Sequence, residues 1–137
     1  QAPNIRLQRE IKMVKKTYMS QIKKTGKITD NFVCAPDPEN MLQWYFVIFG
    51  LDGPYEGGFY LGVLTCPASF PKNAPNIKML VDNGIFMKNE EICMSMTSMH
   101  PESWNPAWTV HQILVGLVSF WYQDELTSGA IYYKDHG

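Results

Sequence analysis

The chain has 137 residues, a formal net charge of −1 at pH 7 and 45% hydrophobic residues. This length predicts one domain, residues 1–137, whose core is large enough to fold without a metal or a disulfide. The near balance of 12 basic and 13 acidic side chains argues against nucleic acid or an acidic membrane as a partner, so recognition is expected through shape and local patches.

Targeting and redox features are sparse. The three cysteines, Cys34, Cys66 and Cys93, stand at wide spacings that argue against a disulfide framework or a four-ligand zinc site and indicate a reducing compartment. The longest apolar run, residues 113–122, is about half of the roughly 20 residues that span a bilayer. The 137-residue chain as a whole is therefore expected to be soluble and to make no membrane contact itself. It begins without a methionine or a signal peptide, which favours an excised piece of a longer protein.

Residues 5–22 are predicted to form an amphipathic helix. Apolar residues recur at steps of three and four, at Ile11, Val14, Tyr18 and Ile22. The remaining faces are basic and carry Arg6, Arg9, Lys12, Lys15 and Lys16. Such charges ordinarily form a solvated face.

Four short β-prone runs follow Gly26, at residues 32–34, 42–49, 59–66 and 77–81. Runs on short connections predict an antiparallel meander. Residues 50–58 supply a glycine-rich hairpin loop, and residues 70–75 a bend in which two prolines fix φ. Because the second and third runs are apolar on both faces, one face is expected to pack on a helix.

Residues 81–107 have no sustained period, which marks a candidate functional segment with Cys93 in its middle. Thr109 is then predicted to cap a second amphipathic helix. Its apolar stripe, broad enough to pack under the sheet, comprises Val110, Ile113, Leu114, Leu117, Val118 and Trp121.

Cys93 is the strongest candidate for chemistry, although a lone cysteine is commonly a small buried hydrophobe. The irregular segment favours a thiol near the surface, and the Asn83 amide could donate to a developing oxyanion. The alternative for Asn83 is a turn formed with Gly84. His100 could pair with Cys93 or serve a structural hydrogen bond, whereas His111 and His136 carry no partner pattern. Phosphate loops, dinucleotide fingerprints and metal-ligand clusters are absent from the sequence.

Six landmarks in order resemble the ubiquitin-conjugating enzymes over about residues 6–131. They are the basic N-terminal helix, the meander, Tyr55-Glu56-Gly57-Gly58-Phe59-Tyr60, Phe70-Pro71-Lys72-Asn73-Ala74-Pro75, Ile92-Cys93-Met94-Ser95 and Trp104-Asn105-Pro106-Ala107-Trp108. The resemblance implies that family's α+β fold: an N-terminal helix, a four-stranded antiparallel meander and a central helix packed on the sheet. The family's C-terminal helices would be truncated here.

Within the family, the sequence is similar to the branch tethered to the endoplasmic reticulum by a C-terminal tail. Asn83 stands ten positions before Cys93, without the His-Pro-Asn triplet of other members, and the segment from Cys93 to Trp104 is long. Val81 and Ile85 replace the Thr and Arg of that branch's pattern. The resemblance implies protein quality control at the cytosolic face of the endoplasmic reticulum if a tail follows, and otherwise a cytoplasmic protein.

The implied reaction is acyl transfer, with Cys93 accepting ubiquitin as a thioester and no metal or cofactor. Asn83 would serve the oxyanion or order its loop, and Ser128 would be the residue beside the active site, with Asp124 a poorer choice. Surfaces for a RING-type ligase would comprise Arg6, Arg9, Phe70, Pro71, Pro106 and Ala107, and the helix would also meet the activating enzyme. Phe70 is expected to be exposed there, with a core anchor as the alternative. A protein substrate and a monomeric state are also implied.

Three alternatives remain open. A catalytically inactive relative would serve as a ubiquitin-binding scaffold, and the same chemistry would support conjugation of another ubiquitin-like modifier. A cysteine hydrolase that uses Cys93 and His100 would instead turn over a small ester or peptide without an activating enzyme.

Overall fold

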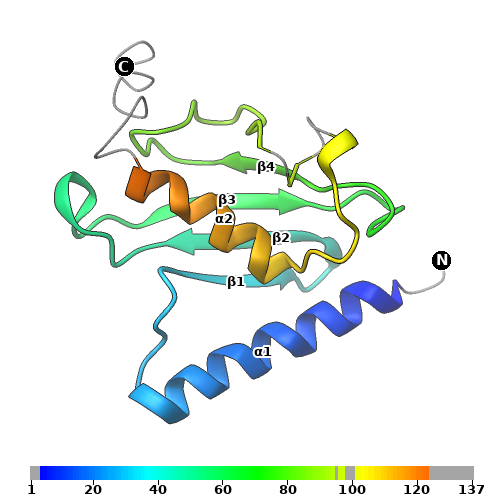
Figure 1. Cartoon of the computed structure of the whole chain (residues 1–137), viewed down its shortest axis with the longest axis horizontal. Helices are drawn as coiled ribbons and strands as arrows, with labels where there is room; N and C mark the ends of the chain where they lie inside the picture. Colours follow the sequence, from blue (N-terminus) through cyan, green and yellow to red (C-terminus); the bar gives the residue numbers. More distant parts are fainter. Residues whose placement is uncertain (1–3, 95, 98–100, 124–137) are drawn as a thin grey trace.

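The computed structural model describes residues 4–94, 96–97 and 101–123. The elements in chain order are α1 (Ile5–Thr25), β1 (Phe32–Asp37), β2 (Asn40–Ile48), η1 (Gly53–Tyr55), β3 (Tyr60–Thr65), β4 (Asn76–Met79), η2 (Pro101–Ser103) and α2 (Val110–Gln123). The strands form one antiparallel sheet in the order β1-β2-β3-β4, so the predicted meander is confirmed. Helix α2 crosses one face of the sheet, and α1 runs along the β1 edge (Figure 1).

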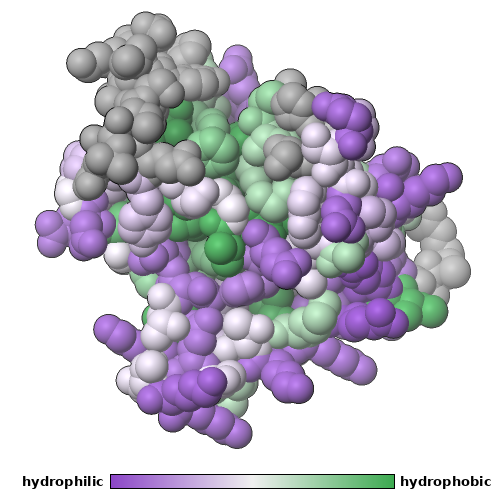
Figure 2. All heavy atoms as spheres, viewed as in Figure 1, coloured by the Kyte–Doolittle hydropathy of each residue, from purple (hydrophilic) through white to green (hydrophobic). Residues whose placement is uncertain are grey.

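Helix α1 has a defined cap at each end. The Asn4 side chain accepts a hydrogen bond from the Leu7 N–H, and Gly26, with φ of 83°, donates its N–H to the Ile22 carbonyl. The helix continues beyond the predicted residue 22 through a polar last turn, in which no apolar side chain marks its presence. Hydrophilic side chains cover most of α1 along the lower edge of the molecule (Figure 2), and four of the five predicted basic residues are exposed.

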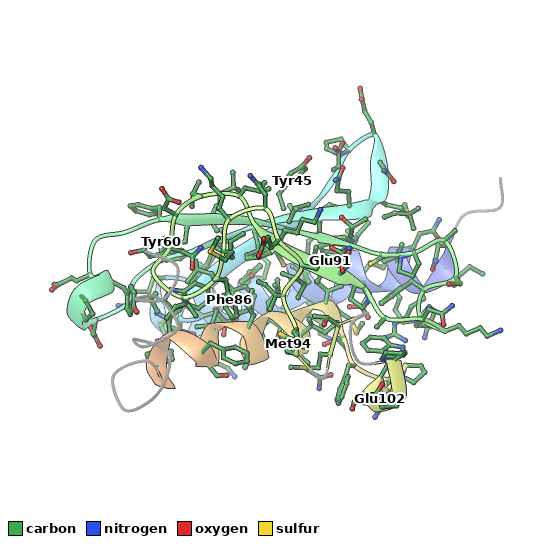
Figure 3. All side chains as sticks on the ribbon, turned by 90° about the horizontal axis from the view of Figure 1, so that it is seen from above. Tyr45, Tyr60, Phe86, Glu91, Met94 and Glu102 are labelled. Carbon is green, nitrogen blue, oxygen red and sulfur yellow. The ribbon has the colours of Figure 1, made fainter. Side chains whose placement is uncertain are left out.

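The sheet buries one face against α2. Trp44, Phe46 and Ile48 alternate inward from β2 and are almost fully buried. Gly62 lies opposite Phe46, where a Cβ would come within 2.2 Å of the ring, so the glycine makes room for the ring. On the other face Tyr45 and Leu61 are 39% and 36% exposed, and Tyr45 points away from α2 (Figure 3).

Strand β1 is longer than the predicted run of residues 32–34 and reaches Asp37. It contains Pro36, which pairs with Trp44. Because β1 is an edge strand, a residue without an N–H donor is tolerated there. Pro36 therefore does not end the strand.

Helix α2 begins with a reciprocal cap. The Gln112 N–H donates to the Thr109 hydroxyl oxygen at 3.1 Å, and the Thr109 N–H donates to the Gln112 amide oxygen at 3.0 Å. The capping role predicted for Thr109 is confirmed, and all six predicted stripe residues are buried. Neither helix within the described residues combines the length and hydropathy of a membrane span.

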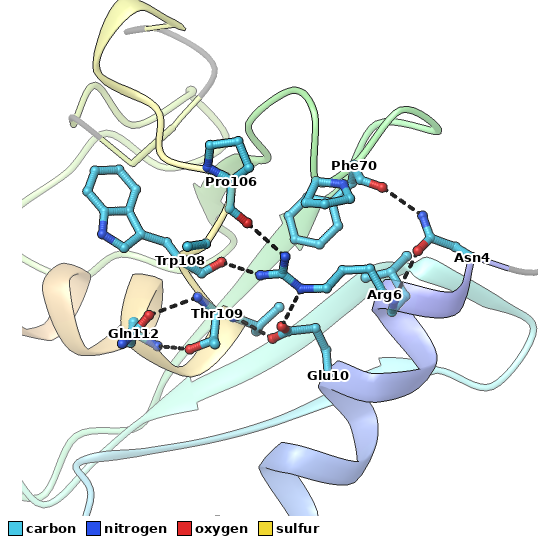
Figure 4. A network of polar contacts seen from close by, with 12 residues as sticks. Asn4, Arg6, Glu10, Phe70, Pro106, Trp108, Thr109 and Gln112 are labelled. Carbon is cyan, nitrogen blue, oxygen red and sulfur yellow. Dashed lines mark hydrogen bonds and ion pairs between the residues drawn. The ribbon is translucent and has the colours of Figure 1, made fainter.

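An ion pair on α1 joins that helix to the chain that leads into α2 (Figure 4). The Glu10 carboxylate is fully buried and accepts from the Arg6 Nε at 2.9 Å and from the Val110 N–H at 2.7 Å. The two terminal nitrogens of Arg6 donate hydrogen bonds to the carbonyls of Pro106 and Trp108, at 2.7 and 2.8 Å. We call this arrangement of Arg6, Glu10 and their three backbone partners the α1 clamp.

Removal of the Glu10 carboxylate should destabilise the protein strongly. In Glu10→Ala the Val110 N–H and the Arg6 guanidinium lose a buried partner, which we expect to lower the free energy of unfolding by about 3–5 kcal/mol. Denaturant unfolding measures the change. The exposed Glu39→Ala serves as the control and should change the free energy by less than about 0.5 kcal/mol. A loss below about 1 kcal/mol for Glu10→Ala would contradict the importance given to the clamp.

Candidate active site

The Asn83 side chain is 5% exposed and bonds to its own loop. Its amide nitrogen donates to the carbonyls of Val81 and Phe86, at 3.0 and 3.1 Å. Its amide oxygen accepts from the N–H groups of Ile85 and Phe86, at 3.0 and 2.8 Å. Both amide hydrogens are engaged by these carbonyls, so the contacts support the loop-ordering role of Asn83 rather than donation to an oxyanion.

The same loop is braced without the Thr and Arg of the tethered branch. Val81 contributes a backbone carbonyl, for which the side chain is immaterial, and Ile85 is buried in the core with 4% exposure. Trp121 of α2 donates its indole N–H to the Asn83 carbonyl at 3.4 Å. Gly84 adopts φ of 87°, which a turn at this point requires.

The segment before Cys93 is fastened along the outer edge of β4. The Asn89 N–H donates to the Met79 carbonyl at 2.8 Å, and the Ile92 N–H donates to the Ile77 carbonyl at 2.9 Å. Ile92 and Met94 are buried, whereas Cys93 between them is exposed. The expectation of a thiol near the surface is confirmed, and its position depends on buried neighbours on both sides.

The other two thiols differ from Cys93 in exposure. Cys34 is half-buried and Cys66 is buried, and none of the three cysteines is in a disulfide. Burial raises the pKa of Cys34 to about 11 and that of Cys66 to about 12. Both thiols are therefore protonated at neutral pH, when a thiolate is the reactive form. Cys93 remains the candidate nucleophile.

Helix α2 lies close to the turn after Cys93. A Cβ on Gly116 would come within 2.1 Å of the Met96 methyl and 3.5 Å of the Met94 methyl. The labelled Met94 lies on the α2 side of the sheet (Figure 3). A glycine within a helix costs about 1 kcal/mol relative to alanine, and here its missing side chain makes room for this segment.

Two loops that were predicted separately as ligase contacts lie side by side. The Trp104 indole N–H donates to the Pro71 carbonyl at 2.8 Å. The Trp104 ring packs against those of Phe70 and Trp108, with centroids 6.1 and 5.7 Å apart. The Arg6 guanidinium carbon lies 5.5 Å from the centroid of the Phe70 ring. The sequence brings these loops together through aromatic packing, and the α1 clamp holds the second loop on α1.

The expectation of an exposed Phe70 ring is wrong. The ring is 3% exposed and belongs to the core cluster, because it is covered by Trp104 and Arg6. Arg6 is likewise committed to the α1 clamp. Arg9, Pro106 and Ala107 are exposed, and Pro71 is half-buried. Beside these loops is a hollow of about 200 Å³, lined by Lys72, Asn73, Ala74, Pro101 and Trp104.

Several predicted residues lie outside the described ranges: His100, Asp124, Ser128 and His136. The structure therefore tests neither the Cys93–His100 pair nor the role of Ser128. In the part of the chain that is described, no group of three His, Cys, Asp or Glu side chains is placed to hold a metal ion.

Two polar pairings were missed from the sequence. His111 was assigned no partner, yet its Nε2 lies 2.7 Å from the Asp30 carboxylate. Glu10 received no role, although its carboxylate holds the first residue of α2. Both contacts join residues 81 or 100 positions apart, which no local period reveals.

The sequence pattern of the family described as "Ubiquitin-conjugating enzyme" matches residues 6–130. The chain is 47% identical over 104 residues to "Ubiquitin-conjugating enzyme E2 6" of Kluyveromyces lactis, a match that covers 75% of this chain and 41% of the relative. It is 45% identical over 106 residues to human "Ubiquitin-conjugating enzyme E2 J2", with 76% and 41% covered. The chain thus spans about half the length of the curated relatives it matches.

Solved structures agree with these matches. Human "Ubiquitin-conjugating enzyme E2 G1" superposes with a TM-score of 0.58 at 26% identity, covering 81% of this chain and 93% of that chain. A structure described as "a putative ubiquitin conjugating enzyme from Plasmodium yoelii" gives a TM-score of 0.65 at 21% identity and covers 98% and 92%. At that identity the second likeness supports the fold alone.

The Asn83 loop yields a stability prediction. Asn83→Ala removes two donors and an acceptor from a buried turn and should lower the free energy of unfolding by about 2–3 kcal/mol. Asn83→Asp keeps the acceptor but sets a second carboxylate oxygen against the carbonyls of Val81 and Phe86, so it should be less stable at neutral pH than at a pH low enough to protonate it. Thermal unfolding orders the variants, with Asn73→Ala, an exposed asparagine bonded to Ser69, as the matched control. Equal stability of Asn83→Ala and Asn73→Ala would show that the turn does not need the amide.

Proposed function

Because this chain belongs to the ubiquitin-conjugating enzyme family, we propose that it carries ubiquitin as a thioester on Cys93 and passes it to a protein substrate with a RING-type ligase. The observation that carries the proposal is the exposed Cys93, held at the edge of β4 between two buried residues. Cys34 and Cys66 are less exposed, and their thiols are held protonated by burial. A thioester carrier needs one accessible sulfur on a rigid support.

The reaction consists of two acyl transfers. In the first, the Cys93 sulfur attacks the thioester carbonyl between ubiquitin and the activating enzyme. A new carbon–sulfur bond forms, the old one breaks, and the proton of the Cys93 thiol passes to the departing thiolate. In the second, a nucleophile on the substrate attacks the Cys93 thioester and loses a proton, and Cys93 leaves as a thiolate that regains one. Ubiquitin is carried rather than hydrolysed, and the activating enzyme supplies the ATP-dependent step.

Asn83 supports transfer by holding its loop in one conformation. Its four hydrogen bonds stay within residues 81–86, and the indole of Trp121 fixes the Asn83 carbonyl. The family resemblance implies that this loop flanks the thioester, where its order would restrict the approach of the acceptor and of water.

The docking surface for the activating enzyme and the ligase comprises Arg9 and the other exposed basic residues of α1 together with Pro106 and Ala107. Arg6 and Phe70 act beneath this surface, since Arg6 is bonded to Glu10 and two carbonyls and Phe70 is buried. They shape the surface rather than offer their side chains to a partner.

We further propose that the protein works in protein quality control at the endoplasmic reticulum. The features that support this are the position of Asn83 ten residues before Cys93 and the long segment from Cys93 to Trp104. The similarity to the E2 6 and E2 J2 relatives is compatible with it.

A charging assay tests the main proposal. The chain is incubated with ubiquitin, activating enzyme and ATP, and the products are run on a gel with and without reductant. We expect a reductant-sensitive adduct that disappears in Cys93→Ala and becomes reductant-resistant in Cys93→Ser, because the serine forms an ester. Cys34→Ala is the matched control and should still form the adduct. No adduct with ubiquitin would overturn the proposal and favour a scaffold or a carrier of another modifier.

Substitutions of Arg6 and Arg9 should distinguish a structural role, which affects stability, from a docking role, which affects charging. Arg9→Ala leaves stability unchanged but should slow charging by about two- to fivefold, the range of an exposed ionic contact, and this loss should shrink at high salt. Arg6→Ala should lower the free energy of unfolding because the buried Glu10 loses its partner. Charging rates at two salt concentrations and denaturant unfolding measure the two effects. If Arg6→Ala left the stability unchanged, the structural role given to Arg6 would be wrong, and a docking role would be favoured instead.

A further inference from the structure

Thr97 has a buried hydroxyl that contacts the chain on both sides of Cys93. The residue is 0% exposed. Its Oγ1 accepts from the Met94 N–H at 3.3 Å and lies 2.9 Å from each of the carbonyl oxygens of Ile92 and Met94, which share its single proton. A buried hydroxyl is costly unless it is hydrogen-bonded, and here every partner is a backbone atom next to the candidate nucleophile.

These contacts limit the rotation of the backbone at Cys93. The Ile92 carbonyl belongs to the peptide plane that precedes the Cys93 Cα, and the Met94 N–H belongs to the plane that follows it. Since peptide units are planar, φ and ψ of Cys93 are the rotations of these two planes about that Cα. One oxygen bonded to both planes therefore restrains both angles, and with them the direction of the Cα–Cβ bond that carries the sulfur.

The neighbours of Cys93 are fixed to the rest of the fold independently. Ile92 is bonded to β4 through the Ile77 carbonyl, and the methyls of Met94 and Met96 lie against the bare Cα of Gly116. The Thr97 N–H also donates to the Met94 carbonyl at 3.0 Å and closes the turn. Thr97 joins these anchored points across the exposed cysteine.

We propose that Thr97 is a positioning residue that sets the orientation of the Cys93 thiol for acyl transfer. The inference rests on the proposed carrier function. Transfer demands that the sulfur meet a carbonyl carbon presented by another protein, so a misdirected sulfur slows it, whereas a small electrophile can approach an exposed thiol from many directions.

The test compares Thr97→Val, which keeps the shape and removes the hydroxyl, with Thr97→Ser, which keeps the hydroxyl and removes a methyl. Thr17→Val is the matched control, because it removes a half-buried threonine hydroxyl from α1. We expect Thr97→Val to slow both charging by the activating enzyme and discharge by about ten- to a hundredfold. Thr97→Ser should retain rates within about threefold of the unaltered chain, and Thr17→Val should match it.

Alkylation of Cys93 by iodoacetamide, followed by mass spectrometry of its peptide, distinguishes misdirection of the thiol from general destabilisation. General destabilisation would change the alkylation rate, whereas misdirection of an exposed thiol would not. The alkylation rate of Thr97→Val should stay within about threefold of the unaltered chain while transfer falls. Unchanged transfer in Thr97→Val, or an equal loss in Thr97→Val and Thr97→Ser, would overturn the proposal. An unaltered chain that forms no ubiquitin adduct fails the proposed function instead, irrespective of Thr97.

Hydrogen exchange on the unaltered chain keeps the proposal testable if Thr97→Val does not fold. The Met94 amide should exchange at least about tenfold more slowly than an unprotected amide, because it donates to a buried oxygen. Exchange at the unprotected rate would overturn the proposal.

Discussion

The ion pair and the hydrogen bond made by the buried Glu10 carboxylate are the contacts on which the junction of α1 and α2 depends. The carboxylate neutralises Arg6 and caps the first residue of α2, so one side chain sets where α1, the loop before α2 and α2 itself meet. A buried ion pair is retained at a desolvation cost that an apolar pair would avoid. Its directionality fixes the register between elements 100 residues apart, a register that non-directional apolar contacts would leave less well defined.

Around Cys93 the backbone is held by side-chain groups rather than by regular structure. Asn83 satisfies the turn on one side of the segment, and Thr97 satisfies the turn that follows the cysteine. The chain can therefore present an exposed sulfur in an irregular segment while the buried side chains of Asn83 and Thr97 are hydrogen-bonded to backbone groups. Polar side chains of this kind do for the loop what a hydrogen-bond ladder does for a strand.

The fold was largely predictable because its elements have clear periods. The stripe of α2 identified its buried face, and Thr109 marked a helix start. In β2 both faces are apolar, so the sequence predicted that one face packs on a helix but not that it is the face of Trp44, Phe46 and Ile48. Ends were less certain, since the last turn of α1 is polar and Pro36 is tolerated only on an edge strand. The role of Phe70 was not predictable, because its burial depends on Arg6 and Trp104, which lie far from it in sequence. Cys93 was found from its context, whereas Glu10 and Thr97 act through contacts that no motif encodes.

Gly116 has an evolutionary consequence. Since its missing Cβ is the space that the Met96 methyl occupies, any larger residue at 116 would require a shorter one at 96 or an outward shift of the turn that carries the thiol. Positions 96 and 116 should therefore covary among relatives that keep this turn. In aligned sequences, a correlated pair of residues at positions 96 and 116 would then report how far α2 lies from the turn after Cys93.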